Sequence, residues 1–401
     1  MKAKHFEAVR VNEHVYWVGA IDWGIRNFHG YTTSRGTTYN AYLILADKVT
    51  LIDTVKAPFL DELLGRIRSV IDPEKIDYIV SNHSEMDHTG SLPAVIDAVK
   101  PEKVFASKMG NKALAAHHLD RVEIEAVENG GSLSLGNLNL RFWETRMLHW
   151  PDSMVSYLAE DKLLFSQDGF GMHLASSERF ADEIEPSILK QEAAKYYANI
   201  LLPYSTLITR LLATVKEVGI DIKVLAPDHG PVWRKDFDIL GWYGGWAKQK
   251  PTMKAVVAFD TMWHSTELMA RAISEGLVEG GATVKVMPLG SSDRSEVVTE
   301  LLDAGAFLVG SPTLNNNMFP TVADLLCYVR GLKPKNLVGQ AFGSYGWSGE
   351  SVNQLVRELE QMKVELVGEP AKVNYVPDET ALARCKVLGR QVAEKIAEKL
   401  R

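Results

Sequence analysis

The segment Ile76-Asp77-Tyr78-Ile79-Val80-Ser81-Asn82-His83-Ser84-Glu85-Met86-Asp87-His88-Thr89-Gly90 decides how the first part of the chain folds. Residues 76–80 form a short apolar run typical of a buried strand, and apolar residues repeat at helical spacing from residue 92. The loop between them carries a set of side chains that can bind metals: His83, Glu85, Asp87 and His88. Because side chains alternate in an extended chain, such a loop can direct several of them to one side. A solvated acidic loop seldom interleaves histidines and carboxylates so tightly, so the segment predicts a metal site.

Three further candidate ligands stand at similar strand ends. They are His149, Asp168 and His229, and each follows an apolar run and enters a turn that contains Gly or Pro. Loops on a rigid sheet are where functional side chains gather. A single histidine at a strand end is more often structural than a ligand, so these residues gain weight from the cluster at residues 83–88.

The rest of the first 250 residues alternates strands with helices less regularly. We expect a hairpin of residues 39–45 and 49–54, a helix from Pro58 to Val70, and a helical stretch from Ser187 to Val218 that is interrupted at Pro203. Further strands are expected near residues 103–105, 138–143, 155–158, 163–165 and 223–225. This order predicts an α/β sandwich, but periodicity alone does not fix which one.

A polar stretch with a proline, residues 247–252, separates this part from a more regular one. After it, five apolar runs alternate with helical patterns, and the last helix runs from about Thr380 to the C-terminus. The predicted strands are residues 255–259, 284–287, 306–310, 337–342 and 364–367. Strands and helices in strict alternation predict a doubly wound parallel sheet. We therefore expect two domains, residues 1–250 and 251–401.

Polar and aromatic residues follow three of the strands in the second part. Ligands of open parallel sheets bind at the carboxyl ends of the strands, so these loops are the candidate cofactor site. A helix begins beside the first loop, where hydroxyl and backbone N–H groups suit a terminal phosphate, although an ordinary helix cap has the same residues. The candidate residues are Thr261, Met262, Trp263, His264, Ser265 and Thr266; Ser311, Pro312, Thr313, Leu314, Asn315 and Asn316; and Ser344, Tyr345, Gly346, Trp347, Ser348 and Gly349. Tyr345 or Trp347 could stack on a flat ring.

The composition excludes several classes of protein. The chain has 401 residues with 46% hydrophobic and 24% charged residues, and its net charge is -7, too acidic and mixed for a nucleic-acid binder. We expect no membrane span and no secretory signal. The two cysteines, Cys327 and Cys385, exclude a four-cysteine metal site and favour a reducing cytoplasm.

The ligand series resembles that of the metallo-β-lactamase fold. The hydrolytic members of that fold usually carry H-x-H-x-D-H, and Glu85 stands where their second His would be. A carboxylate in place of an imidazole makes the site harder and more anionic, which favours iron or manganese over zinc. The resemblance implies two metals bridged by Asp168, with Asp87 and His88 serving one metal from different directions.

The second part is similar to flavodoxin over its whole length, which implies FMN. Its phosphate loop departs from the usual T-x-T-G-x-T pattern, because Trp263 replaces the second Thr and His264 stands where Gly is expected. The sequence has no G-x-G-x-x-G fingerprint, so nicotinamide binding has no support.

Together the two parts resemble the flavodiiron proteins over the entire chain. Residues 144–154 and 343–350 carry the likeness beyond the ligands. It implies reduction of O2 to water or of NO to N2O at two irons, with electrons passing through FMN from an external donor such as rubredoxin. It also implies a cytoplasmic head-to-tail homodimer or dimer of dimers. The candidate pocket residues are His29, Tyr196, Tyr197 and His173.

Two other readings remain open from the residues. One is a dizinc hydrolase fused to a flavodoxin, with a metal-activated water. The other is an electron-transfer module whose first domain is structural and binds no metal tightly.

Overall fold

The computed structural model describes residues 6–117, 123–235 and 238–401, and the chain forms two compact units. Unit 1 consists of Met1–Tyr196 and Thr206–Tyr243, and unit 2 consists of Tyr197–Ser205 and Gly244–Arg401. A short segment from the middle of the sequence therefore belongs structurally to unit 2.

Unit 1 contains two large sheets that pack face to face. The first has seven strands in the order β1 (Val9–Arg10), β2 (Val15–Trp17), β7 (Tyr42–Ile44), β8 (Thr50–Ile52), β9 (Tyr78–Ser81), β10 (Lys103–Ser107) and β11 (Ile124–Val127). The second has six strands in the order β12 (Ser132–Ser134), β13 (Asn139–Glu144), β14 (Met154–Leu158), β15 (Leu163–Gln167), β16 (Val224–Pro227) and β17 (Trp233–Arg234). One buried cluster joins side chains of both sheets, such as Tyr42 and Phe165. Alternation along each strand sends the intervening side chains to the outer faces.

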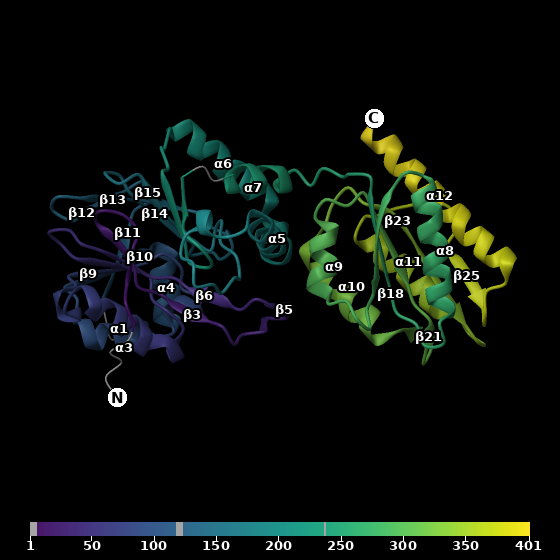
Figure 1. Cartoon of the computed structure of the whole chain (residues 1–401), viewed down its shortest axis with the longest axis horizontal. Helices are drawn as coiled ribbons and strands as arrows, with labels where there is room; N and C mark the ends of the chain where they lie inside the picture. The colour runs from purple at the N-terminus through teal and green to yellow at the C-terminus, as the bar shows by residue number, and fades with distance from the viewer. Residues whose placement is uncertain (1–5, 118–122, 236–237) are drawn as a thin grey trace. The chain divides into compact units, whose positions relative to one another are not determined.

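Helices cover those outer faces and complete an αβ/βα sandwich (Figure 1). Helices α1 (Leu60–Val70) and α3 (Leu92–Val99) bury apolar residues against the first sheet. Helix α6 (Ser205–Val218) lies over the second sheet, where Leu207 and Leu211 face Val155 and Leu164 across a cleft of about 430 Å³. The expected sandwich is confirmed, and it is the one that the metallo-β-lactamase resemblance implied.

The apolar stretch Pro186–Val218 is long enough to cross a membrane by length and composition alone. It is not one helix of uniform geometry, because α5 (Pro186–Tyr196) continues into a π-helical turn (Tyr197–Leu201) and a 3-10 turn (Leu202–Tyr204) before α6. Its buried Glu192 lies 3.1 Å from the guanidinium of Arg35. Such a pair is expected of a helix that packs on a protein core.

Unit 2 is a doubly wound parallel sheet, as predicted. Its strand order is β19 (Thr283–Pro288), β18 (Lys254–Phe259), β20 (Ala306–Gly310), β23 (Val338–Tyr345) and β24 (Glu365–Leu366), and β25 (Ala371–Asn374) also pairs with β23. The strand expected at residues 364–367 corresponds to β24, which pairs with only the first part of β23 at the edge of the sheet. The pairing resumes further along β23, where Phe342 faces Ala371, so two short strands share that edge.

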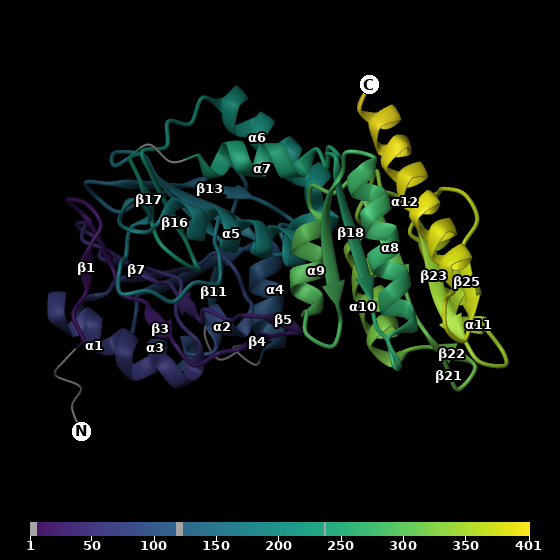
Figure 2. The ribbon, with the colours of Figure 1, turned by 45° about the vertical axis from the view of Figure 1, so that its right-hand side comes forward.

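Helices flank both faces of this sheet (Figure 2). Helices α8 (Ser265–Glu279) and α12 (Glu379–Leu400) lie together on one face and share a buried apolar cluster with the strands. Helices α9 (Arg294–Leu301), α10 (Pro320–Leu332) and α11 (Glu350–Gln361) lie on the other side. The segment Tyr197–Ser205 joins unit 2 through Asn199, whose amide donates to Ser295 O (3.1 Å) and accepts from the hydroxyl of Tyr328 (3.0 Å).

Candidate functional site

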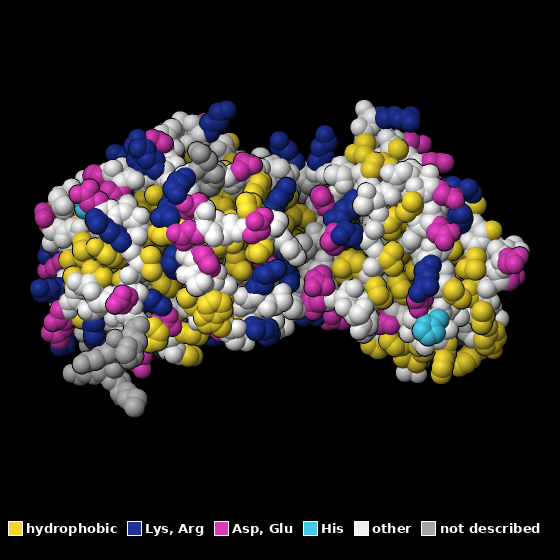
Figure 3. Space-filling view, in the orientation of Figure 1, with side chains coloured by type: hydrophobic (Ala, Val, Ile, Leu, Met, Phe, Trp, Pro, Cys, Tyr) yellow, Lys and Arg dark blue, Asp and Glu magenta, His cyan; other side chains and the backbone are white. Residues whose placement is uncertain are grey.

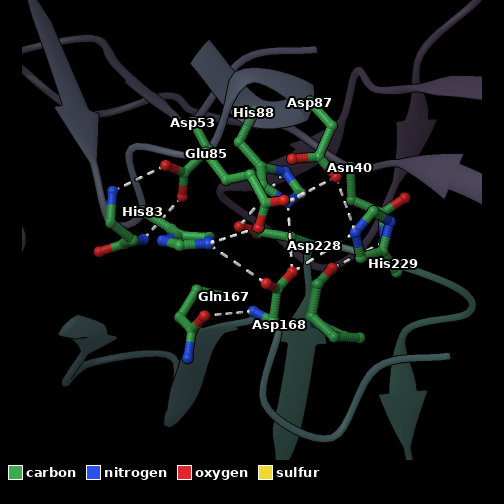
Figure 4. Close-up of polar contacts among 12 residues, drawn as sticks. Asn40, Asp53, His83, Glu85, Asp87, His88, Gln167, Asp168, Asp228 and His229 are labelled. Carbon is green, nitrogen blue, oxygen red and sulfur yellow. Dashed lines mark hydrogen bonds and ion pairs between the residues drawn. The ribbon is translucent and has the colours of Figure 1, made fainter. Parts of the chain in front are cut away.

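Four loops at one end of the two sheets of unit 1 bring the seven candidate ligands together, and Figure 4 shows six of them: His83, Glu85, Asp87, His88, Asp168 and His229. Strand β9 leads into the loop of His83 and Glu85, and the short helix α2 (Met86–Thr89) then presents Asp87 and His88. The other three side chains come from the second sheet. His149 lies in the loop between β13 and β14, Asp168 directly follows β15, and His229 lies just after β16. The sequence separates these residues by up to 146 positions, and the fold places them in one cluster.

Asp168 divides the cluster into two groups. Its Oδ2 lies 2.9 Å from His149 Nε2 and 3.4 Å from His83 Nε2. Its Oδ1 lies 3.2 Å from His88 Nε2 and 3.4 Å from His229 Nε2. One carboxylate thus turns one oxygen toward each pair of histidines, which is the arrangement that a bridging ligand requires.

A second carboxylate belongs to each group. Glu85 Oε2 lies 3.3 Å from both His83 Nε2 and His149 Nε2. Asp87 Oδ2 lies 3.3 Å from His88 Nε2 and 3.1 Å from His229 Nε2. Two ligands about 2.1 Å from one ion and at right angles to it lie about 3 Å apart, so each group has the spacing of a coordination shell.

The outer nitrogens of two imidazoles contact oxygen atoms that orient the rings. His83 Nδ1 lies 3.3 Å from Asp152 Oδ2, and His229 Nδ1 donates to the carbonyl of Thr38 (2.6 Å). Partners of this kind fix the tautomer and turn the Nε2 lone pair inward, as is usual for histidines that bind metals. His88 Nδ1 lies 3.7 Å from Asp228 Oδ2, which is beyond hydrogen-bond distance. Asp152 lies three residues after His149 and Asp228 directly before His229. Their positions in the sequence did not predict that they contact the histidine rings of the cluster.

The clustered carboxylates and imidazoles shift one another's pKa values in the direction that favours bound positive charge. Burial lowers the pKa of His83, but hydrogen bonds with Asp152 and Glu85 raise it to about 10. Burial likewise opposes the rise for His149, whose bonds with Asp168 and Glu85 bring its pKa to about 9. Burial would raise the pKa of Asp168, yet the surrounding imidazoles hold it well below its usual range. The cluster therefore favours positive charge among its carboxylates, and bound metal ions would supply that charge.

Several atoms of the cluster are close together without being hydrogen-bonded. His88 Nε2, which faces Asp168, and both carboxylate oxygens of Asp87 are buried with no hydrogen-bond partner among the described residues. Donor atoms that point toward a common centre, rather than toward one another, have this property. The residues therefore fit a two-metal site.

The candidate pocket residues divide into those that reach the cluster and one that does not. His29 is exposed on the turn between β4 (Asn27–Phe28) and β5 (Tyr31–Thr32), and its Nε2 lies 3.3 Å from Glu85 Oε1. Tyr196 and His173 are buried, with ring centroids 5.1 Å apart, and His173 packs 4.7 Å from His229. Tyr197 belongs to unit 2, where its hydroxyl bonds to Ser205 Oγ (3.0 Å). The structure thus brings His29, Tyr196 and His173 to the ligands and directs Tyr197 elsewhere.

The three candidate cofactor loops of unit 2 meet at the carboxyl edge of its sheet. They follow β18, β20 and β23, which are adjacent parallel strands. Thr266 Oγ1 and Ser344 Oγ lie 3.2 Å apart, which links the first loop to the third. In the second loop, the hydroxyl of Thr313 lies 2.8 Å from that of Ser351 at the start of α11.

The first loop suits a phosphate. The hydroxyl of Thr261 is buried with no hydrogen-bond partner among the described residues, and no side chain caps the N-terminus of α8. His264 has φ +64° and ψ 0°, the left-handed conformation that glycine adopts freely. The departure from the usual glycine therefore keeps a glycine-like backbone at this position. The residues fit a flavin phosphate at the start of the helix.

Large apolar side chains surround these loops. Trp263 and Trp347 are 88% and 89% exposed, and Met262, Tyr375 and Val376 are also exposed. Figure 3 shows hydrophobic side chains gathered at this end of unit 2, where β21 (Thr313–Leu314) lies in Figure 1. Exposed apolar patches of this kind mark binding surfaces.

Comparison with known proteins supports the same assignment for both units. The family described as "ODP family beta lactamase" matches residues 37–230, and the family "Flavodoxin" matches residues 257–387. The "Nitric oxide reductase" of Moorella thermoacetica is 48% identical to the chain, over 98% of the chain and 100% of that protein. The "Rubredoxin-oxygen oxidoreductase" of Megalodesulfovibrio gigas is 46% identical over 98% of the chain and 99% of its own length.

Solved structures agree along the whole chain. The structure of rubredoxin oxygen:oxidoreductase from Desulfovibrio gigas matches with a TM-score of 0.96 and 45% identity, covering 98% of this chain and 100% of that one. The flavodiiron protein from Giardia intestinalis matches with a TM-score of 0.93 and 33% identity, covering 99% of this chain and 98% of that one. The chain belongs to the flavodiiron family. The resemblance drawn from the ligand series and the second part of the sequence is confirmed, and so is the fold that it implied for this flavodiiron protein.

Proposed function

We propose that this flavodiiron protein is an oxidoreductase that reduces O2 to water, NO to N2O, or both, at a diiron centre supplied with electrons through FMN. The observation that carries the proposal is the position of Asp168 between two separate groups of ligands, with one carboxylate oxygen facing each group. A hydrolytic site could share that geometry, but the relatives with high identity over their full lengths are named as reductases of O2 or NO.

The ligands of the two irons follow from the two groups. We assign His83, Glu85 and His149 to one iron, Asp87, His88 and His229 to the other, and Asp168 to both. Glu85 replaces an imidazole with a carboxylate, so the two shells together hold four histidines and three carboxylates. Oxygen-rich shells favour iron over zinc.

The cofactors account for the electrons that the reaction consumes. When bound, FMN can hold two electrons and the pair of irons can hold two more. These four electrons meet the demand of reducing O2 to water and exceed the two electrons needed to couple two NO molecules. The loops around Thr261, Asn315 and Trp347 would hold FMN, with the phosphate at the start of α8. The remaining candidates of these loops would line the isoalloxazine ring.

The protein's own side chains would control protons and water. His29 is exposed and lies 3.3 Å from Glu85, so its imidazole can take a proton from solvent and pass it to the edge of the cluster. Tyr196 and His173 are buried and pack against His229, where they would keep bulk water from the reacting atoms. Tyr197 has no part in this proposal, because its hydroxyl bonds within unit 2.

The electron donor would be a separate small protein such as rubredoxin. The sequence has only two cysteines and cannot form a four-cysteine site of its own. One relative is named for its reaction with rubredoxin, and the exposed patch around Trp263 and Trp347 offers a surface for a donor near the flavin. We further propose a cytoplasmic head-to-tail homodimer, or a dimer of such dimers, with the metal domain in residues 1–250 and the FMN domain in residues 251–401.

Metal and flavin analysis of anaerobically purified protein tests the proposal. We expect two irons and one FMN per chain, and rapid consumption of O2 or NO when reduced protein is mixed with either gas. Two zincs per chain with no gas consumption would overturn the proposed function in favour of a hydrolase.

A further inference from the structure

Gln167 has an unusual conformation at the end of β15, directly before Asp168. It is 1% exposed and has φ +47°, a left-handed conformation that few residues other than glycine adopt. The pairing of β15 with β16 shifts register between Phe165 and Gln167. Backbone strain at a buried residue persists where the surroundings over-determine it, and it is concentrated at functional sites.

The hydrogen bonds of Gln167 join three of the four ligand loops. Its Oε1 accepts from the backbone N–H of Asp168 (2.7 Å), and its Nε2 donates to the carbonyl of Leu148 (2.6 Å). Its own carbonyl accepts from the N–H of Asp228 (2.9 Å). Leu148 and Asp228 each precede a candidate ligand, and Figure 4 shows Gln167 bonded beside Asp168.

We propose that Gln167 is a positioning residue that fixes the His149 loop against Asp168, so that both side chains face the same ion. The result is visible in the 2.9 Å separation of His149 Nε2 and Asp168 Oδ2. An amide is suited to this position because it offers one donor and one acceptor at fixed spacing, whereas a carboxylate offers no donor. The inference rests on the proposed metal centre and concerns the iron of His83, Glu85 and His149.

The other group of ligands has a separate amide. Asn40 Nδ2 donates to the carbonyls of Pro227 (2.7 Å) and Gly230 (2.9 Å), which lie on either side of His229 in the sequence. The His149 loop and the His229 loop are therefore held by different side chains. Loss of the Gln167 amide should release the first loop and leave the second in place.

The substitution Gln167→Met tests this inference, because Met has similar length and no hydrogen-bonding amide. Gln340 in unit 2 supplies a matched control: it is 1% exposed, its Oε1 accepts from the N–H of Ala341 (3.0 Å), and its Nε2 donates to the carbonyl of Gly368 (2.8 Å). Gln340→Met removes the equivalent two bonds, and a longer one from Nε2 to the carbonyl of Val367 (3.3 Å), far from the candidate ligands in sequence. Gln167→Asn is the milder variant, since it keeps the amide but shortens its reach.

The measurement is the occupancy of the two metal positions in the full-length protein. Each variant is stripped of metal, loaded anaerobically with limiting Fe(II), crystallised, and its iron located by anomalous diffraction; thermal unfolding is followed in parallel. In Gln167→Met we expect Fe(II) affinity at the His83/Glu85/His149 position to fall by about 10- to 100-fold, and in Gln167→Asn we expect a smaller fall at the same position. The Asp87/His88/His229 position should change much less. Gln340→Met should load both positions as wild type does.

The outcomes separate the inference from the proposed function. Wild-type protein that binds no Fe(II) would contradict the proposed function itself. If wild type binds two irons, equal loss at both positions in Gln167→Met, or no loss at either, would overturn the inference alone. A fall in unfolding temperature similar to that of Gln340→Met, with both irons retained, would identify Gln167 as merely structural and would also overturn it.

Discussion

The two candidate sites of this molecule are built in opposite ways. In unit 1 the site consists of buried side chains, and the imidazoles and carboxylates displace one another's pKa values. In unit 2 the candidate site consists of loop backbone and hydroxyls, and its largest side chains, Trp263 and Trp347, are almost fully exposed. A site of the first kind concentrates buried charge that needs a partner, whereas the described residues of the second site bring together no buried cluster of this kind. We therefore expect the stability of unit 1 to depend on its ligand, and unit 2 to depend on its ligand for function only.

The largest effect is expected from Asp168→Asn, because Asp168 is the residue proposed to bind both irons. The amide can offer one oxygen to one iron, but it presents an N–H group to the other and removes the negative charge. We expect fewer than two irons per chain and a loss of activity of about 100-fold, which corresponds to about 3 kcal/mol of charge stabilisation. Iron analysis and the rate of O2 or NO consumption measure both.

A matched control is available on the surface of unit 1. Asp182 lies 2.8 Å from Arg234 and is also paired with Lys235, so Asp182→Asn removes a paired carboxylate outside the cluster. This control should retain both irons and full activity. Full iron content in Asp168→Asn would show that the two groups do not share a ligand.

Removal of the metal should reveal the different dependence of the two units. A ligand present at about 1,000 times its dissociation constant stabilises a fold by about 4 kcal/mol, so metal removal should lower the unfolding temperature of unit 1 by about 10 °C. The unfolding of unit 2 should change little. Differential scanning calorimetry of the metal-free and iron-loaded protein gives both transitions.

The metal-free protein should also gain a pH dependence. The folded pKa values of His83 (about 10) and His149 (about 9) lie above the ordinary value of about 6.5 for unfolded histidine. Their contribution to stability is therefore complete below about pH 6.5 and is lost as the pH rises through 9 to 10. The unfolding temperature of metal-free unit 1 should fall between pH 7 and pH 10, while that of iron-loaded protein should not follow this titration. A flat profile for the metal-free protein would contradict the proposed charge balance.

A smaller effect is expected at the flavin loops. Thr261→Val removes a buried hydroxyl that has no partner among the described residues, and a hydrogen bond to a charged phosphate is worth about 1.5–3 kcal/mol. FMN affinity should fall by about 10-fold or more, with unchanged iron content and unchanged unfolding of unit 1. Fluorescence titration of the flavin-free protein measures the affinity. Thr252→Val, which changes a hydroxyl bonded to Asp303 O (2.8 Å), should bind FMN normally; equal losses in the two variants would remove Thr261 from the site.

The local patterns of the sequence were sufficient to predict much of this molecule. The cluster at residues 83–88 indicated a metal site because its residue types are rarely interleaved for any other purpose. The strict alternation after residue 252 indicated a parallel sheet, and the family resemblance added the sandwich of unit 1. The first two are features that short-range spacing encodes, whereas the kind of sandwich came from the resemblance alone. The ligand and flavin residues themselves stay predictions, which the proposed variants test.

Long-range features were not accessible in the same way. Tyr196 and Tyr197 are adjacent in the sequence, but a change to π-helical geometry after Tyr196 sends the second into the other unit. Gln167 and Asn40 resemble ordinary polar residues until the loops that they join are seen together. The fifth strand position of unit 2 is split because pairing with β23 is interrupted between Leu366 and Ala371, which periodicity does not record.

The membership of residues 197–205 in unit 2 has a consequence for synthesis on the ribosome. This segment emerges before the last part of unit 1, yet its partners Ser295 and Tyr328 are translated roughly 100 residues later. Domains generally fold as units, with the N-terminal one first. Leu201 and Leu202, which are buried in the finished protein, therefore lack their unit 2 partners during the synthesis of the last part of unit 1. The nascent chain thus carries an apolar helical segment of its second unit, not yet packed, through the folding of its first.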